Sequence, residues 1–288
     1  MRRLLPLALL IAGCQDYGKL EEDFCTTALA KGVTSCNDFE YTLYDSVPVL
    51  SAGIMMTPIT TGGGVLKIER YAGPDPHDGD VVRYAGPRLT TNIARGTSGQ
   101  DDPSNAYRGT GSLLVTLPDG GPAAALMGAA LPDPATTSGA VSVRFFVYTG
   151  NTPPPGTFEM VRWTSANGST LRTLAYVEGA LRITDGLSGR TSSTAVPLSS
   201  TAWHCIEVDY GVTNAGTEGA PMYQTTVMNV AVDQLNRRGP DLSLPGLPNA
   251  GSVGAIDIGP NRTGASGPAV QLWMDEAIVS SHYIGCSI

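Results

Sequence analysis

The feature that most constrains the fold of this 288-residue chain is a series of short, β-rich segments that begins after residue 106. Clusters of glycine, proline, serine and aspartate separate these segments, which is the pattern of strands joined by turns. No amphipathic helix of ten or more residues and no internal repeat is evident. The sequence therefore predicts an all-β, two-sheet antiparallel sandwich. We expect strands at 111–117, 140–149, 158–164, 170–177, 180–185, 202–210, 223–233, 254–259 and 269–280, with a hairpin turn at 178–180.

The part of the chain before these strands has a different composition. Residues 50–105 contain runs such as TTGGGV and AGPDPHDGD, which are typical of loops and turns. We expect this segment to be a long, irregular insertion. Residues 14–36 are expected to form a tether with one helical turn around 26–31. Residues 37–288 are long enough for one large β domain.

The N-terminus has the features of an export signal. Two arginines precede an apolar run at 4–12, which is too short to span a bilayer because spanning takes about 20 residues. Small residues then precede Cys14, as at a signal cleavage site. The segment IAGC at 11–14 resembles a bacterial lipobox. This resemblance implies a signal peptide at 1–13, a lipid on Cys14 and a membrane anchor. Gln15 is compatible with the outer membrane in lipoproteins of this kind, so we expect an exported protein on the cell envelope.

The charge of the chain limits its partners. After removal of residues 1–13, the chain has 16 basic and 26 acidic residues, a formal charge of −10. Nucleic acid is therefore not an expected partner, because phosphate binding requires a basic surface. Asp75, Asp78 and Asp80 lie in a glycine-proline loop, and oxygen-rich loops suit calcium. Their spacing is not that of an EF-hand, which leaves open both a calcium site and a solvated acidic loop.

Four cysteines remain besides Cys14: Cys25, Cys36, Cys205 and Cys286. An even number in an exported chain favours two disulfides. We favour Cys25–Cys36 together with Cys205–Cys286. The main alternative joins Cys36 to Cys286 and Cys25 to Cys205, because the first and last strands of sandwiches are often neighbours. No C-x-x-C spacing occurs, so these cysteines are not expected to bind a metal.

Three segments resemble the concanavalin A-like jelly-roll superfamily, specifically its LamG and pentraxin-like members. The segment at 199–211 (SSTAWHCIEVDYG) has a Trp-His pair opening a strand. The segment at 270–286 (VQLWMDEAIVSSHYIGC) resembles the closing strand, and 35–40 (SCNDFE) resembles the opening strand. The resemblance implies a two-sheet jelly roll whose concave face most commonly recognises carbohydrate. Trp203 and Trp273 are expected in its core. Some relatives hold calcium and others cleave polysaccharides, and fold alone does not decide among these functions.

Alternation along the strands predicts a polar face. In the strand at 140–149, Arg144 and Tyr148 fall on the side opposite the valines at 141, 143 and 147. The strands at 170–177 and 202–210 contribute four more polar side chains in the same way. We predict that one exposed, concave face binds carbohydrate through these residues, although a solvent-facing polar sheet is the simpler alternative. The six residues are Arg144, Tyr148, Arg172, Tyr176, Glu207 and Asp209.

Catalytic signatures are incomplete. Glu207 and Asp209 resemble the E-x-D-x-x-E strand of jelly-roll glucanases, but Val212 occupies the position of the third acid. No G-x-S-x-G motif occurs, and His204 is expected to be structural. We therefore predict a non-catalytic, membrane-anchored protein that binds carbohydrate or a surface partner. The alternatives are a polysaccharide-degrading enzyme, a lyase ahead of a hydrolase, and a structural envelope lipoprotein without a ligand.

Overall fold

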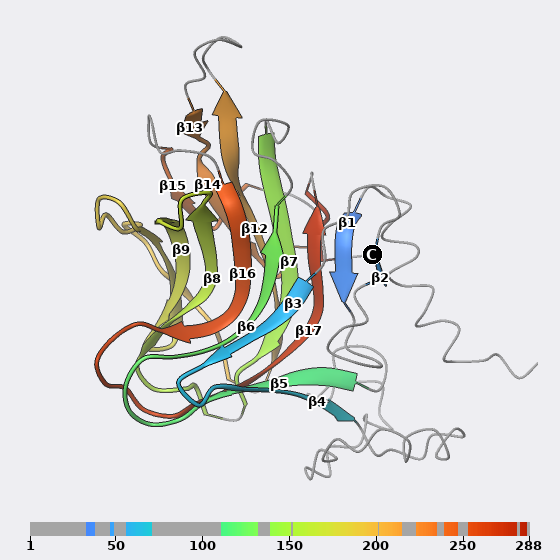
Figure 1. The fold of residues 1–288 in the computed structure, drawn as a ribbon, viewed down its shortest axis with the longest axis vertical. Coiled ribbons are helices and arrows are strands. Elements are labelled where there is room, and N and C mark those ends of the chain that lie inside the picture. The colour runs from blue at the N-terminus through green and yellow to red at the C-terminus, as the bar shows by residue number, and fades with distance from the viewer. Residues whose placement is uncertain are drawn as a thin grey trace, which may run out of the picture.

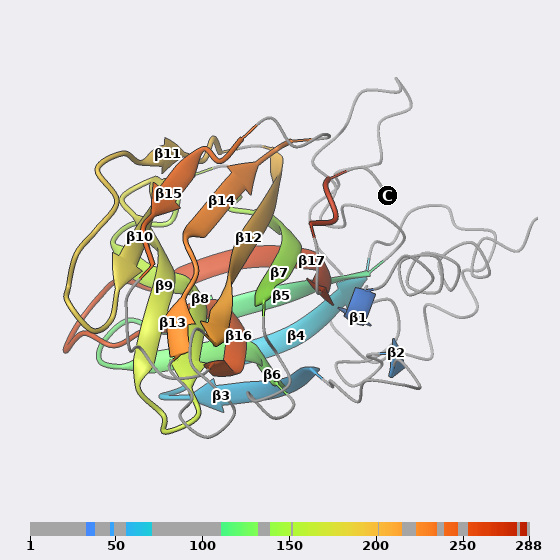
Figure 2. The same ribbon diagram turned by 90° about the horizontal axis from the view of Figure 1, so that it is seen from above.

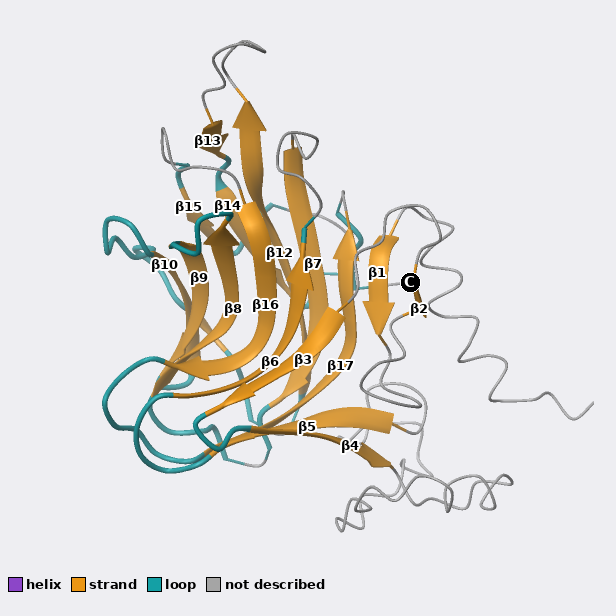
Figure 3. Cartoon of the chain, viewed as in Figure 1, coloured by secondary structure: helices purple, strands orange, loops and turns teal. Residues whose placement is uncertain are grey.

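A computed structural model describes residues 33–37, 47–48, 56–70, 111–131, 139–150, 152–200, 202–214, 223–234, 239–246, 253–280 and 283–286. The regular structure of these residues consists only of strands (Figure 3). No helix long and apolar enough to cross a membrane occurs among them. The predicted signal peptide, the lipidation site Cys14, the helical turn at 26–31 and the calcium candidates Asp75, Asp78 and Asp80 lie outside the described residues.

The larger sheet contains ten of the described strands, all in antiparallel pairs. Short strands pair at its margins: β13 (Tyr223–Thr225) with β12, and β4 (Val65–Arg70) with β5 (Gly111–Leu117), which in turn pairs with β17. Its main path runs through β15 (Leu242–Leu244), β14 (Met228–Val232), β12 (Trp203–Asn214), β7 (Gly139–Tyr148), β17 (Val270–Ser280), β1 (Val33–Asn37) and β2 (Val47–Pro48).

The second sheet contains seven of the described strands, which bend strongly along their length (Figure 1). Figure 2 shows the same two sheets from above. Neighbouring strands are often far apart in sequence, as in β6 beside β16, so the described chain is an antiparallel jelly-roll sandwich, as predicted. The order is β11 (Val196–Pro197), β10 (Ala180–Asp185), β9 (Thr170–Val177), β8 (Thr157–Ser165), β16 (Val253–Arg262), β6 (Ala123–Ala130) and β3 (Met56–Thr61).

The core lies between the two sheets and is built by the alternation of apolar side chains. In β7, Val143, Phe145 and Val147 are fully buried in this core. Leu174 of β9 and Ile256 of β16 meet them from the seven-stranded sheet. Because successive side chains of a strand point to opposite faces, the residues between these positions lie on the outer faces of the sandwich.

The predicted hairpin turn between β9 and β10 is confirmed. Glu178 and Gly179 form the two-residue connection, with φ values of 47° and 92°. Positive φ at both positions is the property of a type I′ turn, whose twist matches that of the paired strands. The predicted bounds of β5, β9 and β10 are also those of the structure.

The prediction that residues 50–105 are irregular is wrong for 56–70, which form β3 and β4. Pro58 lowered the strand signal there, but β3 is an edge strand, where a missing N–H is tolerated. β6 was not predicted because its sequence, AAALMGAA, is poor in β-branched residues. At Gly128, a Cβ would lie 2.5 Å from Ile59 Cδ1 and 3.0 Å from Asp257 Oδ1, so a larger residue would require these side chains to shift. β1 begins inside the predicted tether, and the strand predicted at 223–233 is divided into β13 and β14.

The favoured disulfide Cys205–Cys286 is confirmed. It joins β12 to residues 283–286, which we call the C-terminal strap. Both cysteines are buried and pack against Phe146. Cys36 is also disulfide-bonded, and its partner lies outside the described residues. The alternative pairing of Cys36 with Cys286 is therefore wrong.

Candidate functional site

The prediction of one exposed face shared by six polar residues is wrong. Five of them are at most 2% exposed, and only Asp209 is half-buried. The residues also belong to both sheets rather than one. The larger sheet holds Arg144, Tyr148, Glu207 and Asp209, whereas Arg172 and Tyr176 belong to the seven-stranded sheet.

The C-terminal strap explains why the outer face of the larger sheet is not exposed there. Glu207 Oε1 accepts hydrogen bonds from Ile284 N at 2.5 Å and Ser142 Oγ at 2.8 Å, and Oε2 accepts one from Gly285 N at 2.8 Å. Burial raises the pKa of Glu207, although these three hydrogen bonds act to lower it. Glu207 therefore fastens the strap to the sheet.

Arg144 lies beside Glu207 across the β7–β12 pair and is also bound to the strap. Its Nη2 is 2.9 Å from Glu276 Oε2, and its Nη1 donates to Gly285 O at 3.3 Å. Glu276 is likewise buried, so the ion pair is shielded from water. A buried cation with these partners is part of the folded framework and not a ligand-binding group.

Arg172 and Tyr176 point into the core, the opposite of the predicted direction. Tyr176 stacks on Phe158 with ring centroids 4.8 Å apart. Arg172 Nη2 donates to Pro245 O at 2.5 Å, and its Cζ lies 5.8 Å from the centroid of Tyr210, a core residue. Arg172 and Tyr176 lie on the same side of β9 as Leu174, and this side faces the core. Alternation alone could not tell which side of β9 faces the core, so the prediction assigned these residues to the wrong face.

Tyr148 lies in an aromatic cluster on the outer side of the larger sheet. Its ring centroid is 5.6 Å from that of Trp203 and 5.5 Å from that of Trp273. Both tryptophans are half-buried, so the prediction that they belong to the core is wrong. They instead cover Tyr148, which explains why its side chain is buried.

A pocket of about 530 Å³ lies elsewhere, on the outer face of the seven-stranded sheet. We call it the outer pocket. The strand residues that line the pocket alternate with core residues such as Leu174 and Ile183. The pocket therefore lies on the face of the sheet away from the core. Strands β8, β9 and β10, the end of β16 and the loop after β16 form its walls. Its lining residues are Gly156, Thr157, Phe158, Glu159, Thr173, Ala175, Thr184, Asn261, Arg262, Thr263, Gly264, Ser266, Gly267 and Pro268.

Glu159 is the charged acceptor of the outer pocket. Its Oε2 accepts hydrogen bonds from Arg162 Nε at 2.8 Å, Arg162 Nη2 at 2.5 Å and Asn261 Nδ2 at 2.5 Å. Oε1 has no hydrogen-bond partner among the described residues. The carboxylate is thus held in place through one oxygen while the other is free to accept from a ligand.

Arg262 shapes the wall of the pocket. Its guanidinium donates to Gly121 O at 2.9 Å, to Pro268 O at 2.6 Å and to Pro118 O. These bonds hold the loop after β16 against the loop before β6. A Cβ on Gly267 would lie 2.7 Å from Arg262 Cδ, so the close approach requires glycine there.

Asp257 lies one step further along the same face, opposite Arg162 in the β8–β16 register. Burial raises its pKa, the charge of Arg162 lowers it, and the charge of Glu159 raises it again. The net direction for the pKa of Asp257 is upward. Among the described residues, no group of three potential metal ligands is found.

Sequence reasoning missed this pocket for two physical reasons. Glu159 and Asn261 are 102 residues apart and meet only because β8 pairs with β16. An irregularity between Glu159 and Val161 also shifts the alternation of β8 midway. A usable signal was the turn-rich segment 263–268 directly after a strand, since binding residues often lie on such loops.

No protein-family model and no curated protein matches this chain. Similar solved structures include the cellulose-induced protein Cip1, at 14% identity and a TM-score of 0.43, covering 63% of this chain and 84% of that one. The alginate lyase vAL-1 from Chlorella virus is 11% identical with a TM-score of 0.41, covering 60% of this chain and 85% of that one. The botulinum neurotoxin serotype C1 binding domain is 8% identical with a TM-score of 0.43, and the match covers 88% of this chain but 49% of that one. These similarities are too weak to indicate a ligand or an activity.

Proposed function

We propose that this protein is a carbohydrate-binding protein and that a neutral saccharide binds in the outer pocket. The observation that carries this proposal is the pocket of about 530 Å³, which is within the size range of small-molecule sites. Its wall carries a fixed carboxylate, an amide and several hydroxyl groups.

The chemistry of the lining suits a polyol. The hydroxyl groups of Thr157, Thr173 and Thr184 can each donate and accept a hydrogen bond, as sugar hydroxyls do. The free Oε1 of Glu159 can accept from a sugar hydroxyl, and hydrogen bonds to a charged group are the stronger kind. The ordered positions of Glu159 and Asn261 reduce the entropy lost on binding.

The charges of the pocket favour neutral over acidic saccharides. The one cation in its lining, Arg262, already donates to three backbone carbonyl groups. Because each of its three nitrogens is already engaged and the side chain is buried, Arg262 is poorly placed to pair with a uronate carboxylate. Glu159 would also repel such a group, because like charges disfavour each other at short range.

The test is a binding measurement on the full chain with neutral and uronic oligosaccharides, by glycan array and then calorimetry. Glu159→Gln should weaken binding of the selected neutral saccharide about tenfold or more, because it replaces a charge-assisted hydrogen bond worth about 1.5–3 kcal/mol. Glu178→Gln is the matched control, since it removes the same charge at an exposed turn outside the pocket. Binding only of uronic saccharides, or equal binding by both variants and the wild type, would refute the proposal.

We also propose that the protein is lipid-anchored through Cys14 at the outer membrane. The basis is the lipobox-like segment at 11–14 alone. Mass spectrometry of the membrane fraction should find a lipid on Cys14, and Cys14→Ser should release the protein or leave the signal uncleaved. An unmodified Cys14 in a membrane-bound protein would contradict this proposal.

A further inference from the structure

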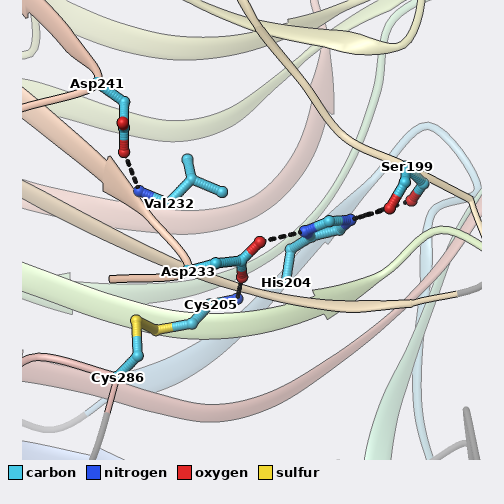
Figure 4. A network of polar contacts seen from close by, with 7 residues as sticks. All are labelled: Ser199, His204, Cys205, Val232, Asp233, Asp241 and Cys286. Atoms are coloured by element: carbon cyan, nitrogen blue, oxygen red, sulfur yellow. Dashed lines mark hydrogen bonds and ion pairs between the residues drawn. A yellow bond between two sulfur atoms is a disulfide. The ribbon is translucent and has the colours of Figure 1, made fainter. Parts of the chain in front are cut away.

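Three side chains with acid–base and nucleophilic chemistry meet at the start of β12, outside the outer pocket (Figure 4). Ser199 Oγ is 3.0 Å from His204 Nε2. The other ring nitrogen, Nδ1, is 2.7 Å from Asp233 Oδ2. A hydroxyl on one nitrogen and a carboxylate on the other is the arrangement of a serine nucleophile, its general base and the group that orients the base.

Asp233 is held in position by a second contact. Its Oδ1 accepts a hydrogen bond from the backbone N–H of Cys205 at 2.8 Å, as Figure 4 shows beside the Cys205–Cys286 disulfide. Asp233 also has a φ of 55°, which is the left-handed region that non-glycine residues rarely adopt. Such conformations persist where the surrounding structure fixes them, and they are frequent at functional sites.

The serine is open to solvent while the imidazole is shielded from it. Ser199 is exposed, the His204 side chain is 9% exposed and the Asp233 side chain is 49% exposed. Burial of the imidazole lowers its pKa, but the hydrogen bond and charge of Asp233 and the Ser199 carbonyl raise it, and the net direction is upward. With its proton on Nδ1, facing Asp233, the ring presents an unprotonated Nε2 as the acceptor for the Ser199 hydroxyl proton.

The Ser199 carbonyl oxygen is a further partner of the imidazole, 3.1 Å from Nε2. It can accept a hydrogen bond only when Nε2 carries a proton. It therefore helps to hold the imidazolium that exists after the serine proton has been transferred. Asp233 stabilises the same charged form from the other side of the ring.

We propose that Ser199, His204 and Asp233 form a hydrolytic site for carboxylic esters. Ser199 and His204 are its catalytic residues, and Asp233 is a positioning residue that acts through His204. This activity is independent of saccharide binding in the outer pocket, because none of the three residues lines that pocket.

The reaction balances with water as the only co-reactant. Ser199 Oγ attacks the ester carbonyl carbon while His204 Nε2 takes the hydroxyl proton. The bond from that carbon to the alkoxy oxygen then breaks, and His204 returns the proton to the leaving alcohol, which gives an acyl-serine. Water attacks the acyl-serine and passes a proton to His204, and the carboxylic acid leaves as Ser199 Oγ regains that proton.

The first test is covalent labelling of the full chain with a fluorophosphonate, followed by peptide mass spectrometry. The phosphonyl adduct is expected on Ser199. The second test is the hydrolysis of p-nitrophenyl acetate. After subtraction of the uncatalysed background, Ser199→Ala and His204→Ala should each lower the hydrolysis rate at least 100-fold. Ser200→Ala is the matched control, because it removes a neighbouring hydroxyl that makes no hydrogen bond to the histidine, and it should leave the rate unchanged.

Asp233→Asn tests the positioning role of Asp233 through the pH–rate profile, which a purely structural role would leave unchanged. Without the carboxylate, the pKa of His204 should fall, so the rising limb of the pH–rate profile should move to lower pH while the rate at its plateau decreases. The proposal is overturned if Ser199 acquires no adduct, or if wild type and Ser199→Ala hydrolyse the ester equally. Lower thermal stability of His204→Ala with either result would mean that the three residues only fasten the loop before β12.

Discussion

Removal of the Cys205–Cys286 disulfide should destabilise the protein by an amount that the chain length between the cysteines determines. The two residues are separated by 81 positions. The loop-closure entropy released in the unfolded chain for such a separation corresponds to about 4.5 kcal/mol at 25 °C. Native bridges in exported domains typically contribute about 2–5 kcal/mol, so we expect Cys205→Ala/Cys286→Ala to lose about 3–5 kcal/mol.

The native state of this double variant should keep the C-terminal strap in place. Ile284 N and Gly285 N still donate to Glu207, and Cys286 N, a backbone group, still donates to Gln234 O at 3.1 Å. The loss should therefore arise mainly in the unfolded state. The urea dependence of the unfolding free energy should also rise, because the unfolded chain exposes more surface without the cross-link.

Equilibrium urea unfolding, followed by tryptophan fluorescence, measures both quantities. Non-reducing peptide mapping of the wild type serves as the control that the bond is present. A double variant within about 0.5 kcal/mol of the wild type, with the bond confirmed in the latter, would refute the assignment of the cross-link as a main source of stability.

Three further predictions concern buried charges. Arg144→Met should lower the unfolding free energy by about 3–5 kcal/mol in urea, because it leaves the buried Glu276 without its guanidinium, and Glu276→Leu in the same chain should recover much of the loss. Burial raises the pKa of Asp257, so this residue contributes most to stability below its unfolded pKa, and the contribution is lost as the pH rises through the folded pKa. Asp257→Asn should therefore be more stable than wild type at pH 7. An equal or lower melting temperature of the variant would contradict this. The pKa of His204 is also raised on balance, because Asp233 favours the charged form more than burial opposes it. The stability of the wild type should therefore fall as the pH rises from the unfolded pKa through the folded pKa of this histidine. His204→Gln should abolish this pH dependence, and an unchanged pH dependence in the variant would exclude His204 as its origin.

Most of the fold could be predicted because strand and turn signals are local. The β9–β10 hairpin follows from two β-rich runs that are separated by the turn at 178–180. β6 could not be predicted, since alanine and glycine carry no strand signal of their own. The side chains of Ile59 and Asp257 approach Gly128 from neighbouring strands, and that proximity is visible only in three dimensions.

The candidate sites were less predictable because alternation gives the face of a sheet but not what covers that face. Arg144 is on the side of β7 away from the core, as predicted, yet the C-terminal strap lies over it. The partners in the two sites are also distant in sequence. Glu159 meets Asn261 across 102 residues, and His204 meets Asp233 across 29, with no motif that links either pair.

The position of β17 has a consequence for biosynthesis. This strand is the last of the described strands to leave the ribosome, yet it lies inside the larger sheet, between β7 on one side and β1 and β5 on the other. Until residues 270–280 have emerged, one edge of β7 is unpaired and β1 lacks its pairing with β17. Pairings of such high sequence separation also form slowly. The larger sheet therefore cannot be completed until the last of the described strands has been synthesised.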